Sequence, residues 1–158
     1  MTLPRLFLGL LLLPLTLSAE RSAELLTVAE SYMEAYTAQD YPELATFYTP
    51  STVFDDPTAA GMWGQSFTVE GGENIVEAMR TGWSLIQDFK FKTREHIVYH
   101  DRVVLVGTSH MTVDGAMIGR KAGQSFSFDL PAVTILRIVD GKVLLHLDHY
   151  DYSPMREG

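Results

Sequence analysis

The chain has no cysteine among its 158 residues. This absence excludes disulfide bonds, thiolate zinc sites, cysteine nucleophiles and an N-terminal cysteine that carries a lipid. Basic residues are also few, with 12 Lys and Arg against 20 Asp and Glu, and the formal net charge is −8. No basic cluster with interleaved aromatic residues is present, so we expect no nucleic-acid partner.

The one long apolar run lies at the start of the chain, where Leu6–Leu17 follows Arg5. A basic residue, an apolar stretch and the small pair Ser18–Ala19 are typical of a secretory signal peptide. We therefore expect residues 1–19 to be cleaved and residues 20–158 to form one mature domain. The run is short for a membrane span, and a retained membrane anchor is the alternative interpretation. Cleavage predicts a periplasmic or secreted protein with no stable membrane anchor.

Helical spacing of apolar residues dominates the first half of the mature chain. Ser22 and Asp40 are placed to cap two successive helices, and Pro50 is placed to end the second. A short strand is expected at Thr52–Asp55, followed by a third helix from about Glu73 to Gln87.

After residue 88 the pattern changes to long segments rich in β-branched and aromatic residues, separated by turn signals. The expected strands are Phe89–Tyr99, Val103–Val113, Ser125–Val139 and Lys142–Tyr152. Helices followed by antiparallel strands indicate an α+β fold. About three N-terminal helices packed on a strongly curved antiparallel sheet of about six strands would enclose a cone-shaped cavity for a small molecule.

The segment from Tyr32 to Pro57 resembles the opening of ketosteroid isomerases and of the wider SnoaL-like, nuclear transport factor 2-like superfamily. Polyketide cyclases and limonene epoxide hydrolase are further members of this group. The resemblance implies a conical α+β barrel in which a helix Tyr and an Asp before a Pro face one cavity. Laid on the isomerase pattern, Tyr32 takes the place of the hydrogen-bond donor and Asp56 that of the proton-shuttling carboxylate.

The last strand carries a second polar cluster. Because side chains alternate along a strand, His146, Asp148 and Tyr150 share one face. Resemblance to the terminal strand of SnoaL-like proteins implies that this face looks into the pocket. In the epoxide hydrolase branch, the residue matched by Asp148 activates water. That branch also uses an Arg and a second Asp in the region occupied here by Thr108–His110.

At one position this sequence differs from the isomerase pattern. Thr134 stands where the second acid of the isomerase should be, and its hydroxyl is a weaker donor. Asp129 lies nearby, and alternation places it on the opposite face unless Pro131 marks a bulge. The acid that stabilises the oxyanion therefore stays unassigned.

Further candidates for contact with the bound molecule are Trp63, His110, Phe128, Thr134 and Tyr150. Trp63 is expected to cover the cavity mouth or to pack on the helices.

Each main candidate also has a structural interpretation. Tyr32 fits an ordinary core tyrosine, Asp56 fits a turn before Pro57, and His146 with Asp148 fits a simple paired contact. His110, His146 and Asp148 match no metal-binding motif, so we expect no metal and no cofactor.

Two classes of function follow. In the first, the protein is an enzyme that uses acid–base catalysis on a small hydrophobic molecule, as an isomerase, cyclase, dehydratase or hydrolase. Its catalytic residues are Asp148, Asp56, Tyr32 and His146, with Asp148 favoured as the base because His146 and Tyr150 share its strand face. In the second, it is a noncatalytic module that binds an apolar ligand or serves in association. Val133, Ile135 and Leu147 on the outer sheet face also predict a homodimer.

Overall fold

The computed structural model describes residues 13–157, so residues 1–12 of the predicted signal peptide lie outside the described residues. The helices are α1 (Leu13–Thr37), α2 (Tyr41–Phe47), α3 (Ala60–Trp63), α4 (Gly72–Gly82) and α5 (Ser153–Glu157), with 3-10 turns η1 (Pro57–Ala59), η2 (Trp83–Leu85) and η3 (Gly115–Ile118). The strands are β1 (Val53–Asp56), β2 (Phe67–Glu70), β3 (Ile86–Tyr99), β4 (Arg102–Asp114), β5 (Ser125–Val139) and β6 (Lys142–Tyr150). Among the described residues, no helix is both long and apolar enough to cross a membrane.

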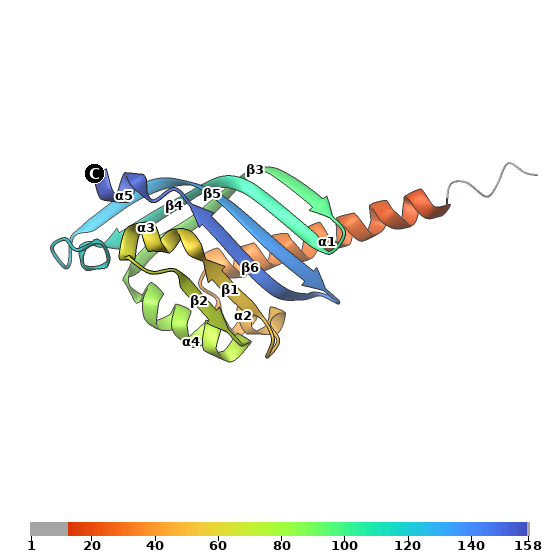
Figure 1. Cartoon of the computed structure of the whole chain (residues 1–158), viewed down its shortest axis with the longest axis horizontal. Helices are drawn as coiled ribbons and strands as arrows, with labels where there is room; N and C mark the ends of the chain where they lie inside the picture. Colours follow the sequence, from red (N-terminus) through yellow and green to blue (C-terminus); the bar gives the residue numbers. More distant parts are fainter. Residues whose placement is uncertain (1–12, 158) are drawn as a thin grey trace, which may run out of the picture.

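The six strands form one curved sheet in the order β2-β1-β6-β5-β4-β3, with helices on its concave side (Figure 1). Neighbouring strands are antiparallel except for β1 and β6, which run parallel. This pairing brings the strand that ends at Asp56 beside the strand that carries Asp148. The α+β architecture with a curved, unclosed sheet is therefore confirmed.

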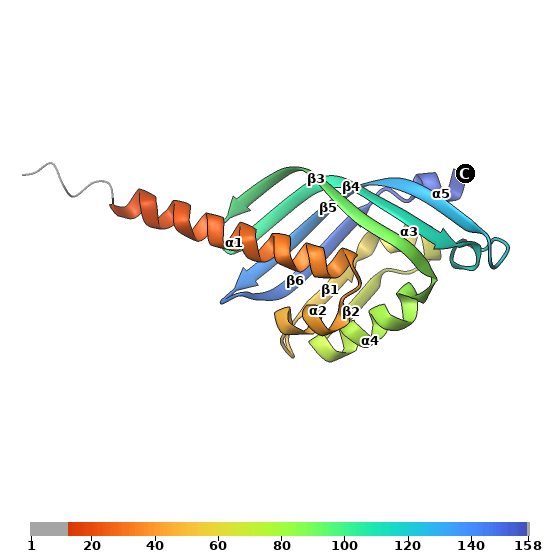
Figure 2. The same ribbon diagram turned by 180° about the vertical axis from the view of Figure 1, so that it is seen from behind.

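Helix α1 lies across β3, β4 and β5, and its N-terminal part projects beyond the sheet (Figure 2). Its buried side chains follow helical spacing and include Leu25, Ala29, Tyr32 and Tyr36. The expected start at Ser22 was wrong. The helix already begins at Leu13, and the Ser22 hydroxyl donates back to the Ser18 carbonyl instead of capping a helix end.

The second helix has the predicted cap, because Asp40 Oδ1 accepts a hydrogen bond from the Glu43 amide. The predicted end of the third helix was wrong. Helix α4 stops at Gly82, and Ile86 opens β3 by pairing with Val113. Ile86 is buried and in phase with the helix pattern, so spacing alone could not separate the two structures.

Alternation of burial along the sheet separates an inner face from an outer face. His146, Asp148 and Tyr150 are all buried on the inner face, as predicted from the two-residue period. On the outer face, the strand register aligns four apolar side chains across β3, β4, β5 and β6: Ile97, Val104, Ile135 and Leu147.

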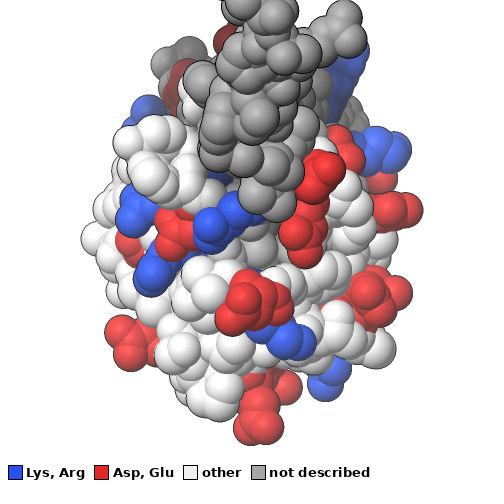
Figure 3. All heavy atoms as spheres, turned by 90° about the vertical axis from the view of Figure 1, so that its right-hand side faces the viewer, with Lys and Arg blue, Asp and Glu red and all other residues white. Residues whose placement is uncertain are grey.

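Charged side chains of both signs are interspersed on the face shown in Figure 3. Arg137 of β5 pairs with Asp101 of the β3–β4 turn, with 2.8 Å between Nε and Oδ2. Such exposed pairs contribute little to stability, typically about 0 to 1 kcal/mol. The fold therefore depends on the apolar core between helices and sheet.

Candidate functional site

An apolar cavity of about 430 Å³ lies between the concave face of the sheet and the helices. It is lined by Tyr36, Phe54, Asp56, Ala59, Trp63, Phe67, Ala78, Gly82, Trp83, Leu85, Ile86, Phe89, Met111, Ala116, Met117, Asp148, Tyr150, Tyr152 and Met155. Among these described residues, the only charged side chains are two carboxylates, Asp56 and Asp148. A concave apolar site with a few polar groups is the usual form of a small-molecule site.

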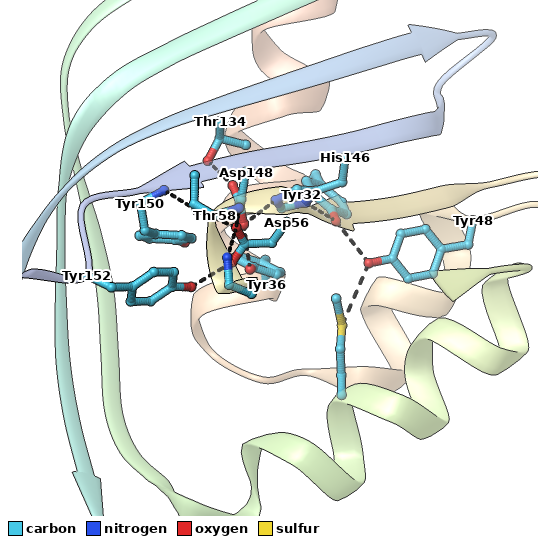
Figure 4. Close-up of polar contacts among 12 residues, drawn as sticks. Tyr32, Tyr36, Tyr48, Asp56, Thr58, Thr134, His146, Asp148, Tyr150 and Tyr152 are labelled. Atoms are coloured by element: carbon cyan, nitrogen blue, oxygen red, sulfur yellow. Dashed lines mark hydrogen bonds and ion pairs between the residues drawn. The ribbon is translucent and has the colours of Figure 1, made fainter. Parts of the chain in front are cut away.

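Asp148 is completely buried in the wall of this cavity. Thr134 is its partner across β5 and β6, so the two side chains leave the sheet side by side. The Thr134 hydroxyl donates to Asp148 Oδ1 at 2.5 Å, and the Tyr36 hydroxyl donates to Oδ2 at 3.0 Å (Figure 4). Two donors from different elements therefore stabilise the carboxylate and fix its orientation.

His146 lies beside Asp148 and behind the cavity wall. Its Nε2 is 2.8 Å from Asp148 Oδ2, but the ring is poorly aligned for a hydrogen bond. On the other side of the ring, Nδ1 is 2.7 Å from the Tyr32 hydroxyl, which is 2.9 Å from the Tyr48 hydroxyl. Tyr32 and Tyr48 thus hold the imidazole against the carboxylate.

The tyrosines of the site stay protonated over a wide pH range. Burial, followed by the nearby Asp148 charge, raises the pKa of Tyr36 and of Tyr150 well above the ordinary value. Burial, followed by the neighbouring Tyr48, raises the pKa of Tyr32 in the same direction. These hydroxyls therefore stay neutral and keep their protons at any physiological pH.

Asp56 lines the same cavity but is also the cap of η1. Its Oδ1 accepts hydrogen bonds from the amides of Thr58 and Ala59 at 3.0 and 3.1 Å, and from the Thr58 hydroxyl. Its Oδ2 accepts a 2.6 Å hydrogen bond from the Tyr152 hydroxyl. Asp56 therefore fixes the chain where β1 turns into η1, which is a structural task.

Trp63 lies at the end of α3 and lines the cavity. Its indole packs edge-on against Tyr152, with ring centroids 5.1 Å apart, and Nε1 donates to the Met117 carbonyl at 3.2 Å. The side chain is 41% exposed, so it forms part of the boundary between cavity and solvent.

The structure brings together only some of the predicted site residues. The cavity is lined by Asp56, Asp148, Trp63 and Tyr150. Behind the lining, Thr134 and His146 are buried and contact Asp148, and Tyr32 is buried and contacts His146. The expectation that Tyr32 itself faces the cavity was therefore wrong, because His146 lies between Tyr32 and Asp148.

His110 and Phe128 do not lie in the cavity wall, contrary to the expectation for both. His110 is on the outer sheet face, where its Nδ1 is 2.8 Å from Asp129 Oδ1. The β4–β5 register runs through Pro131 without a bulge, so Asp129 keeps its outward orientation. Phe128 is half-buried and packs against the core.

A family model, the SnoaL-like domain, matches residues 29–146, which is most of the chain. The chain belongs to the SnoaL-like family. Comparison with curated proteins gives no match.

Solved structures share the SnoaL-like fold across most of their length. A protein from Shewanella putrefaciens, designated a SnoaL-like polyketide cyclase, is 28% identical, with 85% of this chain and 94% of that chain covered and a TM-score of 0.76. Its counterpart from Shewanella denitrificans is 24% identical, with 84% and 94% covered and a TM-score of 0.75. An LEH-like epoxide hydrolase from M. tuberculosis is 15% identical, with 87% and 90% covered and a TM-score of 0.64.

Two tyrosines of the site in this SnoaL-like chain were not predicted from the sequence. Tyr36 lies one helical turn after Tyr32 and is the helix tyrosine that reaches Asp148 and the cavity. Tyr152 follows β6 and holds Asp56. Helical spacing marked Tyr36 as buried, but only the packing of α1 on the sheet shows which tyrosine meets the carboxylate.

Metal ligands do not gather in the part of the chain that the structure describes. Within residues 13–157, no three His, Asp or Glu side chains are close enough together to hold a metal ion. The polar groups of the cavity are instead carboxylates and hydroxyls, which suit proton transfer and hydrogen bonding.

Proposed function

We propose that this SnoaL-like protein is an acid–base catalyst that moves a proton on an apolar carbonyl compound, as an isomerase or a cyclase does. Asp148 is the base. The observation that carries the proposal is a buried carboxylate, held by Thr134 and Tyr36, in the wall of an apolar cavity. The designation of the Shewanella putrefaciens relative as a polyketide cyclase supports the same class of chemistry.

Asp148 suits this role better than Asp56 does. A base needs other groups to orient it, and Asp148 has Thr134, Tyr36 and His146 around it without serving as a cap for the main chain. Asp56 accepts two main-chain amides and two hydroxyls, so its replacement would first disturb the start of η1.

Proton transfer on carbon is favoured over hydrolysis of an epoxide. The epoxide hydrolase resemblance includes an Arg near the base, but no Lys or Arg is among the described residues that line the cavity. On β4, the corresponding region places Ser109 on the inner face, where it offers a neutral hydroxyl. A carbonyl group needs a hydrogen-bond donor and no cation, and one of the tyrosines that line the cavity, Tyr150, has an unpaired hydroxyl.

Deuterium exchange tests the proposed catalysis without knowledge of the natural substrate. We expect the protein to accelerate exchange at the carbon next to the carbonyl of an apolar ketone such as α-tetralone in D₂O, measured by proton NMR. The Asp148→Asn variant should lose about a hundredfold or more of this rate. Asp129→Asn, which alters an exposed carboxylate on the outer face, is the matched control and should keep the rate.

Binding of the ketone without exchange would contradict the proposal and favour the noncatalytic ligand-binding alternative.

We also propose that the protein acts after export to the periplasm or medium. The charge, apolar run and small residues of positions 1–19 support this location. Mass spectrometry of the protein from fractionated cells should find an N-terminus near Glu20. Recovery of an intact Met1–Ala19 segment on cytoplasmic protein would contradict it.

A further inference from the structure

Three buried side-chain polar atoms in the described part of the chain make no hydrogen bond: Ser109 Oγ, His146 Nε2 and the Tyr150 hydroxyl. Buried polar groups are nearly always paired, so each such atom calls for a partner that the protein itself does not supply. His146 Nε2 at least has the Asp148 carboxylate at 2.8 Å. Among the three residues, only Tyr150 lines the cavity. Its hydroxyl is closed to a water-sized molecule in this structure. Because its ring lines the cavity, it is the one of the three that a bound molecule could reach after a small shift of the side chain.

Position on the strand places this hydroxyl next to the proposed base. Tyr150 follows Asp148 by two residues on β6, so both side chains leave the inner face in the same direction. The Tyr36 and Ser109 hydroxyls lie near enough to lower the pKa of Tyr150, but neither forms a hydrogen bond with it, and Tyr36 donates to Asp148. Burial and the Asp148 charge outweigh them and raise that pKa, so Tyr150 keeps its proton.

The hydroxyl of the neighbouring tyrosine, Tyr152, differs from that of Tyr150 because it already has a partner. The Tyr152 ring lies beside that of Tyr150, with centroids 5.4 Å apart, and both rings line the cavity (Figure 4). The Tyr152 hydroxyl already donates to Asp56 at 2.6 Å, so it has no proton to offer a ligand. Of the two adjacent phenols, only Tyr150 has a free donor.

We propose that Tyr150 donates a hydrogen bond to the carbonyl oxygen of the substrate and stabilises the enolate that forms when Asp148 removes the adjacent proton. This inference rests on the proposed function and names the second catalytic residue. The C–H electron pair moves into a carbon–carbon double bond, and the carbonyl π electrons move to the oxygen. That oxygen then accepts a stronger hydrogen bond from Tyr150, and Asp148 later returns its proton to carbon. The substrate class is an apolar ketone or ester with a hydrogen on the carbon beside its carbonyl group.

A pair of probes that differ in one oxygen tests the contact. The protein should bind the ketone α-tetralone more tightly than its hydrocarbon counterpart tetralin. The Tyr150→Phe variant should lose about threefold to tenfold in affinity for α-tetralone and nothing for tetralin, as measured by NMR titration. Exchange of the ketone with D₂O should fall further, by about a hundredfold, because the donor matters more once the enolate forms.

Tyr41→Phe removes a tyrosine hydroxyl outside the cavity, so it is the control for ligand binding and should keep the preference for the ketone. Tyr152→Phe is the matched control for stability, since it removes a hydroxyl from the adjacent ring. It should lower the melting temperature, because Asp56 Oδ2 loses its donor. Tyr150→Phe should leave the melting temperature unchanged or raised, because its hydroxyl has no partner to lose.

The outcomes separate this inference from the proposed function. Exchange that survives in Tyr150→Phe would contradict the role of Tyr150 and leave Asp148 as the base. A ketone preference that depends on Tyr150, without exchange by the unaltered protein, would support the contact and contradict the catalysis. Equal affinity of the unaltered protein for the two probes, or binding of neither, would overturn the inference.

Discussion

Three side chains hold Asp148 in the cavity wall, and they differ in how firmly each one does so. Thr134 donates at 2.5 Å to one oxygen and Tyr36 at 3.0 Å to the other, while His146 is close to the second oxygen but poorly aligned. A buried carboxylate is costly without donors. Loss of the Thr134 hydroxyl should therefore lower the stability of the protein more than loss of either other contact.

Thr134→Val tests that contact at nearly constant side-chain volume. We expect the free energy of unfolding to fall by about 1 to 3 kcal/mol, because Asp148 Oδ1 loses its donor in a buried site. Chemical denaturation measures this change. The matched control is Thr68→Val, which removes the equivalent cross-strand bond to Asp55 in an exposed place. Equal, small effects at both positions would show that the buried bond contributes no more than the exposed one.

The close pairing of β3 with β4 depends on a glycine. Gly107 on β4 allows β3 to come close, since a Cβ there would lie 2.3 Å from the Lys92 carbonyl oxygen. This close approach occurs next to the β3 irregularity between Thr93 and Glu95, where the register with β4 shifts. The local spacing of the two strands thus depends on a missing side chain.

Gly107→Ala should therefore separate β3 from β4 locally and destabilise the protein by about 1 to 3 kcal/mol. Gly82→Ala is the control, because Gly82 has helical φ of −69° and no atom within 4 Å of an added Cβ. That variant should gain about 0.4 to 1 kcal/mol. Thermal unfolding followed by circular dichroism compares the two. A neutral Gly107→Ala variant would mean that β3 is not held by this contact.

Local patterns predicted the elements whose period was unambiguous. Alternation along β6 placed His146, Asp148 and Tyr150 on the inner face, because a two-residue period depends only on the strand itself. The end of α4 could not be predicted in the same way, since Ile86 fits both a helix and a strand. Strand β2 is only four residues long, Phe67–Glu70, and was missed.

The site could be predicted only in part, because its geometry is tertiary. Tyr32 and Tyr36 lie on the same face of α1, and the crossing of that helix over the sheet decides which one meets Asp148. Similarly, the cap formed by Asp56 depends on residues Thr58 and Tyr152, which are brought together by the β1–β6 pairing. No periodicity in the sequence carries this information.

For the molecule as a whole, the buried tyrosines predict a steep alkaline limit to stability. Burial, as the first cause, raises the pKa of Tyr32, Tyr36, Tyr48, Tyr150 and Tyr152. A pKa raised in the folded state means that the folded protein holds protons that the unfolded chain releases. The stabilisation is complete below about pH 10, where unfolded tyrosine begins to titrate, and is lost as pH rises further.

Urea denaturation at increasing pH should show constant stability up to about pH 10 and a fall above it, of about 1.4 kcal/mol per pH unit for each buried tyrosine. Tyrosinate absorbance should appear together with unfolding. Titration of these tyrosines near pH 10 in protein that is still folded would contradict the burial that the structure shows.

The outer sheet face predicts association of two copies. Ile97, Val104, Ile135 and Leu147 form an apolar row across four strands, and Ile97 is 59% exposed. In a twofold dimer the same surface of each copy makes the contact, so an apolar row of this kind could pack against its own copy. Sedimentation should give the mass of a dimer, and Ile135→Lys should shift it to a monomer. A monomeric unaltered protein at micromolar concentration would contradict this prediction.

The central claim is that Asp148, and not Asp56, is the base in the cavity. The most direct measurement compares the rates of deuterium exchange into α-tetralone catalysed by Asp148→Asn and Asp56→Asn, at a temperature where circular dichroism shows both variants folded. We predict a loss of about a hundredfold or more for Asp148→Asn and a loss of less than about tenfold for Asp56→Asn, whose main defect should be reduced stability. The reverse ranking, with exchange lost in Asp56→Asn and kept in Asp148→Asn, would contradict the account.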